Sequence, residues 1–133
     1  MLTLLNVRDQ STAGLGKTEH MFNVRVSADT ISVRELIRRR VYQEVHEYNR
    51  RKPEFFHLLV QPGEAERTRY GFRMARPRPI DPQEQFEKAI EGFERNGFVI
   101  LVDGRQVEGL EAQFEARPET SVTFLKLVPL VGG

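Results

Sequence analysis

The chain has 133 residues, of which 39% are hydrophobic and 29% charged, with a formal net charge of +1, and these values fit one compact domain. It contains no Cys, which excludes a disulfide framework, a thiolate nucleophile and a Cys-based zinc site. No apolar run approaches the roughly 18 residues of a membrane span, and the start of the chain shows no signal peptide. We therefore expect a cytoplasmic protein that has no membrane partner.

The balanced net charge hides an uneven distribution. Residues 34–52 hold seven basic and three acidic side chains, whereas residues 79–120 hold ten acidic and four basic ones. Arginine runs can bind phosphate backbones, but few aromatic residues are interspersed among these ones, so nucleic acid is not expected as a partner. A solvated helix face is the favoured interpretation, and contact with an acidic protein surface is the next.

The first predicted elements are two strands, at residues 2–8 and 20–26. Between them lie Gly14 and Gly16, which favour a turn. In the second strand, apolar residues alternate with Asn23 and Arg25, as in a sheet with one buried face. The pair is predicted to form a hairpin.

A long helix is predicted next. Ser32 can cap its start, with Glu35 three residues later completing a capping box. An apolar stripe follows at every fourth residue, and the helix is expected to end near Asn49. The stripe should face a core while the arginines of the helix face water. The stripe consists of Val33, Ile37, Val41 and Val45.

The stretch from residue 53 to residue 97 is predicted to be an insertion. Residues 54–60 and 67–74 are interpreted as two strands, and a second helix starts at Asp81 with Pro82 in its first position. This helix is expected to end at Asn96 and Gly97, which tolerate positive φ.

The remaining elements are strands. Residues 98–102 form a continuous apolar run typical of an interior strand, and Asp103-Gly104 favours a tight turn into a short strand at 105–107. A final strand is predicted at 121–128. Its alternation places Leu125 and Leu127 on one face and Phe124 and Lys126 on the other.

Three segments resemble ubiquitin. Residues 24–33 (VRVSADTISV) are similar to its second strand and the step into its helix, residues 100–109 (ILVDGRQVEG) to its third and fourth strands, and residues 119–125 (ETSVTFL) to the entry to its last strand. The chain also ends in Gly132-Gly133. The resemblance implies an α+β, β-grasp fold with a mixed sheet and one main helix. It implies a single domain over residues 1–128, with the insert at 53–97, and a flexible tail at 129–133.

The resemblance implies a prokaryotic ubiquitin-like protein modifier. Gly133 would be adenylated by an E1-like enzyme with ATP and passed to target proteins through an E2-like conjugating enzyme, with a JAB-type peptidase as a further partner. A Cβ at Gly132 or Gly133 would clash in the narrow channel that leads to the adenylate. The chain would therefore be a substrate rather than an enzyme. No catalytic residue, cofactor or metal site is expected in it, and its three His residues lack ligand spacing.

Two other functions remain open. Pro129-Leu130-Val131-Gly132-Gly133 is equally similar to the ends of the sulfur carriers of molybdopterin and thiamine synthesis, in which the last carboxylate becomes a thiocarboxylate. A non-conjugated β-grasp adaptor would instead use a sheet face, since the fold does not decide function.

The partner-binding residues are expected in two places. The tail residues Pro129, Leu130 and Val131 would enter the activating enzyme. Leu101 is aligned with the centre of ubiquitin's recognition patch, and Phe124 and Lys126 would join it if their side of the last strand is the exposed one.

Overall fold

The computed structural model describes residues 2–13 and 18–128, which form an α+β fold built on a mixed five-stranded sheet. The sheet has the order β2-β1-β9-β6-β7. Only β1 and β9 run parallel, and every other neighbouring pair is antiparallel. The strands are β1 (Thr3–Ser11), β2 (Thr18–Val26), β6 (Phe98–Val102), β7 (Arg105–Val107) and β9 (Ser121–Lys126). The predicted first hairpin is confirmed, and the last strand ends two residues before its predicted boundary.

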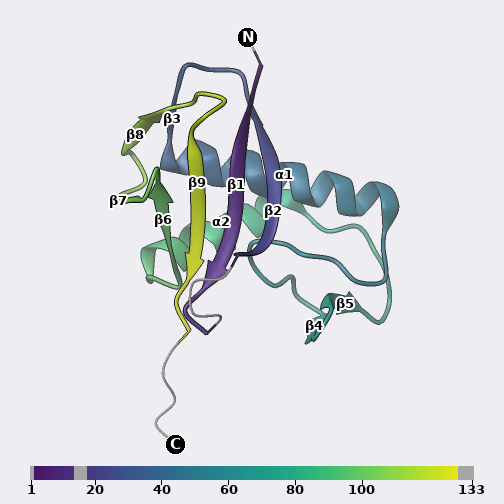
Figure 1. The fold of residues 1–133 in the computed structure, drawn as a ribbon. Coiled ribbons are helices and arrows are strands. Elements are labelled where there is room, and N and C mark those ends of the chain that lie inside the picture. The colour runs from purple at the N-terminus through teal and green to yellow at the C-terminus, as the bar shows by residue number, and fades with distance from the viewer. Residues whose placement is uncertain (1, 14–17, 129–133) are drawn as a thin grey trace, which may run out of the picture.

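Both helices pack on one face of this sheet (Figure 1). Helix α1 (Val33–Arg51) starts where the Ser32 hydroxyl accepts the backbone N–H of Glu35 at 3.1 Å, as the sequence predicted. Helix α2 (Pro82–Glu94) starts where the Asp81 carboxylate accepts the N–H of Gln83 at 3.0 Å, and Asn96 follows its end with a φ of 59°. The two-layer arrangement leaves the opposite face of the sheet uncovered, which we call the outer face.

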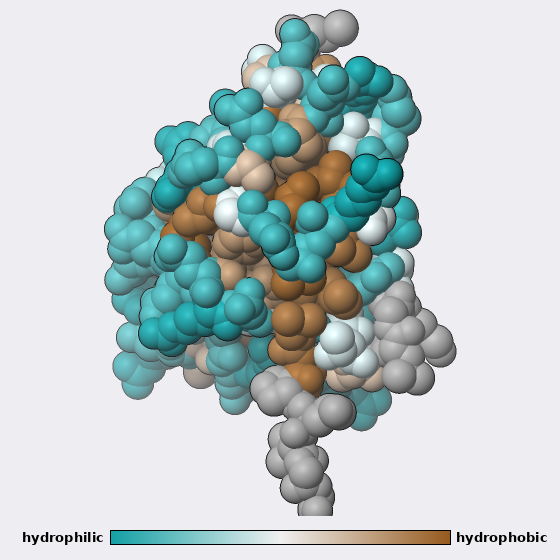
Figure 2. All heavy atoms as spheres, turned by 90° about the vertical axis from the view of Figure 1, so that its left-hand side faces the viewer, coloured by the Kyte–Doolittle hydropathy of each residue, from teal (hydrophilic) through white to brown (hydrophobic). Residues whose placement is uncertain are grey.

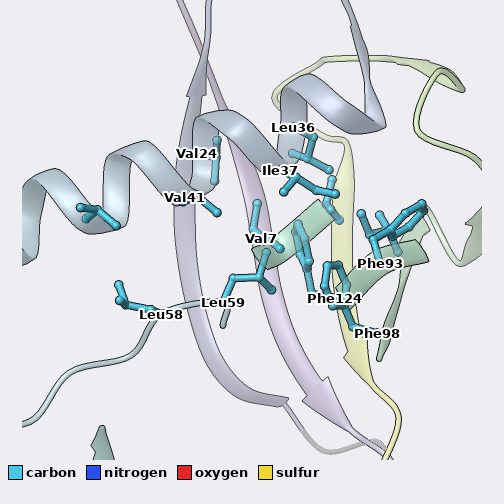
Figure 3. Packing of buried hydrophobic residues seen from close by; sticks show 14 of the residues in the cluster. Val7, Val24, Leu36, Ile37, Val41, Leu58, Leu59, Phe93, Phe98 and Phe124 are labelled. Atoms are coloured by element: carbon cyan, nitrogen blue, oxygen red, sulfur yellow. The ribbon is translucent and has the colours of Figure 1, made fainter. Parts of the chain in front are cut away.

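The core lies between the sheet and the helices (Figure 3). Leu36, Ile37 and Val41 of α1 meet Val7 and Phe124 of the sheet, and all five are buried. Phe93 of α2 extends the core through Phe98, with ring centroids 5.8 Å apart. The apolar stripe predicted for α1 is therefore confirmed as a core face.

The inserted segment differs from the prediction. Residues 67–74 are the larger part of a small hairpin of β4 (Ala65–Thr68) and β5 (Gly71–Met74), rather than one strand. The predicted strand at 54–60 is wrong, since Phe56 makes only an isolated bridge with Phe72, through reciprocal backbone hydrogen bonds of 3.0 and 2.8 Å. Leu58 and Leu59 are buried, so this apolar run fills part of the core instead of joining a sheet.

Two short strands that the sequence did not indicate form a separate ribbon. They are β3 (Thr30–Ser32) and β8 (Gln113–Glu115), which pair antiparallel ahead of α1. The predicted turn at Asp103-Gly104 is confirmed, with φ of 49° and 82° at its two residues, as the tight turns of antiparallel hairpins require. No helix in the described part of the chain is long and apolar enough to cross a membrane.

Candidate functional site

The site that the sequence points to lies at the end of β9, where the chain leaves the sheet. The backbone N–H of Thr12 donates to the carbonyl of Lys126 at 3.0 Å, and the Thr12 hydroxyl accepts the N–H of Val128 at 2.8 Å. On the other side, the N–H of Leu127 donates to the carbonyl of Gly97 at 3.0 Å. The chain is therefore held in place as far as Val128, between the end of β1 and the start of β6. The predicted tail residues Pro129, Leu130, Val131, Gly132 and Gly133 lie outside the described residues.

Leu101 lies on the outer face of the sheet, as the resemblance implied. It is half-buried and stands opposite Thr123 of β9, while Val99, two residues earlier, stands opposite Leu125. Leu127 continues the same face of β9 and is 37% exposed. We call Val99, Leu101, Leu125 and Leu127 the outer-face cluster. Figure 2, which views the molecule from the side of β6 and β7, shows hydrophobic residues exposed in a band that runs toward the end of β9.

Phe124 does not belong to this face, so the condition under which it would join Leu101 in a partner-binding patch is not met. Its side chain is fully buried and points into the core beneath the helices (Figure 3). Its ring lies 5.8 Å from the ring of Phe98. Leu101 and Phe124 therefore lie on opposite faces of the sheet, because neighbouring residues of β9 alternate and Leu101 pairs with Thr123.

Lys126 shares the inner face with Phe124, but at the rim of the sheet. It lines a pocket with Asp9, His20 and His57, apart from the outer-face cluster. Burial lowers the pKa of Lys126, an effect that Arg40 and Arg67 reinforce and that Asp9 and Glu44 oppose. The predicted group of Leu101, Phe124 and Lys126 is thus not one patch.

Next to this pocket lies a buried charge network that was not predicted from the sequence. Arg40 of α1 is fully buried, and its two terminal nitrogens donate to the two carboxylate oxygens of Asp9 at 2.7 Å each. Glu44, one helical turn further, accepts from Arg40 Nε at 3.2 Å and from the backbone N–H of Leu59 at 3.2 Å. The expectation that the arginines of this helix all face water is therefore wrong for Arg40.

Aromatic rings complete the surroundings of Arg40. The centre of its guanidinium lies 4.5 Å from the ring centroids of both Phe22 and Phe124, so it is held between two aromatic faces. Burial by itself lowers the pKa of Arg40, but the carboxylates of Glu44 and Asp9 outweigh this effect and raise it. Burial raises the pKa of Glu44, and the nearby charge of Asp9 adds to this effect, whereas Arg40 and the N–H of Leu59 oppose it.

A spacing signal could have identified this network. Leu36, Arg40, Glu44 and Tyr48 recur every fourth residue, beside the apolar stripe, so the two charged residues occupy a column that begins and ends in the core. His20 and His57 gave no such signal. They lie far apart in the sequence, yet the fold stacks their rings with centroids 5.1 Å apart.

The described residues hold the chain in place where it leaves the sheet after β9, and they provide an apolar face beside this point. Within residues 2–13 and 18–128, no three His, Asp or Glu side chains come together in a way that would hold a metal ion. The sequence and the structure were also compared with known proteins: no protein family model, no curated protein and no solved structure matches the chain.

Proposed function

We propose that this α+β chain is a ubiquitin-like β-grasp protein whose Gly133 carboxyl group is adenylated by an E1-like enzyme and then transferred to target proteins. The observation that carries the proposal is the path of β9. This strand pairs with β1 and β6 in the middle of the sheet and leads directly to residues 129–133, which end in two glycines. The order of hairpin, main helix, strand pair and central last strand supports the β-grasp assignment.

The reach of the tail determines where an activating enzyme has to contact the protein. Five residues in extended conformation span at most about 18 Å. Because the chain is fixed at Val128, an active site that receives Gly133 must lie within about that distance of the end of β9. The outer-face cluster lies at this end, so it is the surface that we expect the partner to cover.

In this function the protein is a substrate and its partners supply the chemistry. The Gly133 carboxylate attacks the α-phosphate of ATP in the activating enzyme, pyrophosphate leaves, and the acyl group passes from AMP to a thiol. A lysine amine of a target then takes the acyl group and releases the thiol. An E2-like enzyme fits the transfer step, and a JAB-type peptidase fits the later hydrolysis of the isopeptide bond, in which water restores the Gly133 carboxylate and the lysine amine.

The test uses the full chain with a free Gly133 carboxyl group, added with ATP to a lysate of the cells from which it comes. Lys126 is the last basic residue, so trypsin leaves residues 127–133 (LVPLVGG) attached to any modified target lysine. Peptide mass spectrometry is expected to find this remnant on target peptides. The control variants are a chain that ends at Gly132 and Gly133→Val, neither of which should give conjugates.

The other outcomes distinguish the remaining functions. Replacement of one carboxyl oxygen of Gly133 by sulfur, seen in the intact mass, would assign the chain to the sulfur carriers. If Gly133 stays chemically unchanged although ATP is consumed by other E1-like activities in the same lysate, the proposal is wrong and a non-conjugated adaptor is favoured.

A further inference from the structure

A small pocket of about 210 Å³ lies where the insertion meets the inner rim of the sheet. The ends of β1, β2 and β9 form one wall, and the segment before β4 and the β4–β5 hairpin form the other. The charged and imidazole side chains that line it are Asp9, Glu19, His20, His57, Arg67, Arg69 and Lys126. The pocket therefore depends on the insertion.

Three of these side chains are cations without a carboxylate partner. No Asp or Glu of residues 2–13 or 18–128 forms an ion pair with Arg67, Arg69 or Lys126 within 4.0 Å. The guanidinium of Arg67 lies 5.5 Å from the ring centroid of Phe72, and that of Arg69 lies 5.1 Å from the ring centroid of Tyr70. Arg73 of the same hairpin, in contrast, pairs with Glu66 at 3.0 Å.

The two carboxylates in the pocket wall are already engaged elsewhere. Both oxygens of Asp9 accept from Arg40 at 2.7 Å, and Glu19 accepts the hydroxyl of Ser11 at 2.7 Å. The guanidinium behind Asp9 offsets its charge. The remaining positive charge of the lining exceeds the negative charge, and it faces a partly enclosed volume in which electrostatic attraction is stronger than in water.

We propose that this pocket binds a phosphate group, held by Lys126, Arg67 and Arg69, with His20 and His57 as additional N–H donors. Arginine presents paired N–H groups that match two phosphate oxygens, and lysine adds a point charge. The volume is below the about 300–1,000 Å³ of pockets that bury drug-sized ligands, so it suits a compact anion. The source is either free inorganic phosphate or a small phosphomonoester.

The electrostatics of the pocket agree with this assignment. Burial lowers the pKa of both Lys126 and His20. Arg40 and Arg67 lower the pKa of Lys126 further, whereas Asp9 and Glu44 raise it. The pKa of His20 is raised by Asp9 and lowered by three cationic or imidazole neighbours, His57, Arg40 and Lys126. A bound dianion would favour the charged form of each group, so phosphate is expected to raise both pKa values.

The test is titration of the full chain with sodium phosphate and, separately, with glycerol 3-phosphate, at pH 7 and constant ionic strength, by calorimetry. A second measurement follows the pKa of Lys126 and His20 by NMR with and without phosphate. Lys126→Gln and Arg69→Gln are expected to weaken binding about tenfold each, as loss of one charge-assisted contact does. The matched controls Lys88→Gln and Arg105→Gln remove the same charges from exposed positions and should leave the affinity within about twofold.

The results distinguish free inorganic phosphate from a phosphomonoester, and they show whether the pocket binds phosphate at all. Tighter binding of inorganic phosphate assigns the free ion, and tighter binding of glycerol 3-phosphate assigns a phosphomonoester. Absence of saturable binding, or equal weakening by pocket and control variants, would overturn the inference. Arg69 is exposed, so its variant keeps the test valid even if Lys126→Gln does not fold. None of these outcomes depends on the chemistry of Gly133.

Discussion

Arg40 is tolerated in the core because every part of its side chain has a partner. Two carboxylates take its N–H groups, and two aromatic rings cover its faces. Desolvating such a group is costly, and the cost is offset only while the whole set of partners is present. The network also joins β1, α1 and the start of the insertion, since Glu44 accepts the N–H of Leu59.

Arg40→Met is expected to lower the free energy of unfolding by about 3–5 kcal/mol, because it leaves Asp9 and Glu44 buried without a cation. Urea unfolding followed by circular dichroism measures the change. Arg39→Met is the matched control, since Arg39 lies on the exposed side of α1 and its pair with Glu35 is solvated; its effect should stay within about 0.5 kcal/mol. Equal effects of the two variants would show that the buried network adds nothing.

His20, which stands opposite Asp9 of this network on the neighbouring strand, links stability to pH. Burial lowers its folded-state pKa below the ordinary value of 6.5, so the unfolded chain binds more protons between the two pKa values. The contribution of His20 is therefore complete above pH 6.5 and is lost as the pH falls through the folded-state pKa. The resulting change in the free energy of unfolding should be smaller than ~1.4 kcal/mol per pH unit, which is the value for the uptake of one full proton, because the imidazole is half exposed and screened.

The variant His20→Phe keeps a ring against Phe22 and His57 but cannot titrate. Its free energy of unfolding, measured from pH 7.5 to pH 5, should decrease less steeply than that of the unmodified chain. His46→Phe, on α1 and away from this stack, is the control and should retain the original slope. A steeper decrease for His20→Phe would contradict the assigned direction of the pKa shift.

Among the elements, the free edge of β2 is partly closed by a side chain. Gln43 of α1 accepts the backbone N–H of Arg25 at 3.2 Å and donates to the carbonyl of Asn23 at 2.6 Å. Its amide thus pairs with the edge as a neighbouring strand would. Unpaired edge strands favour association between molecules, so this contact protects the sheet.

Gln43→Ala is expected to speed amide hydrogen exchange at Arg25 by about 2- to 10-fold, the equivalent of one net hydrogen bond of ~0.5–1.5 kcal/mol. NMR exchange rates at single amides measure it. Gln43→Glu is the matched control, because the carboxylate still accepts from Arg25 but cannot donate to Asn23. It should preserve the protection at Arg25, and equal loss of protection in both variants would refute the proposed role of this side chain.

Elements with local signals were predictable, whereas those defined by distant neighbours were not. The caps at Ser32 and Asp81 and the Asp103-Gly104 turn depend on nearby residues, and each is found where the sequence indicates. Residues 54–60 have the composition of a strand, but the fold offers them no strand partner beyond the bridge at Phe56. Composition alone does not contain that information.

At the site, alternation in β9 was predictable but the choice of face was not. The sequence correctly separates Phe124 and Lys126 from Leu125 and Leu127. Which pair faces the helices depends on packing: α1 and α2 cover the face of Phe124, and Lys126 escapes full burial because it lies at the rim. The position of Arg40 in the Leu36–Tyr48 column was visible, but its acidic partner Asp9 lies 31 residues earlier.

For the whole molecule, the two faces of the sheet have different roles. The inner face carries the helices, the insertion and the charged pocket, and the outer face carries the cluster beside the chain exit. A partner that receives the tail can cover the outer face without displacing the insertion. The proposed contact with an activating enzyme and the proposed phosphate binding at the inner pocket should therefore be separable by substitution.

Leu101→Lys is expected to slow conjugation of Gly133 at least about tenfold, because a charge within a covered apolar contact is costly, while stability changes by about 1 kcal/mol or less at this half-exposed position. The rate at which the 127–133 remnant appears on targets measures the first effect, and thermal unfolding measures the second. Met21→Lys is the control, since Met21 is 69% exposed on the same outer face. It lies in the same cross-strand row as Leu101 but three strands away, at a distance of about 14 Å. Conjugation at the original rate by Leu101→Lys, or equal slowing by both variants, would exclude the outer-face cluster as the surface that the activating enzyme covers.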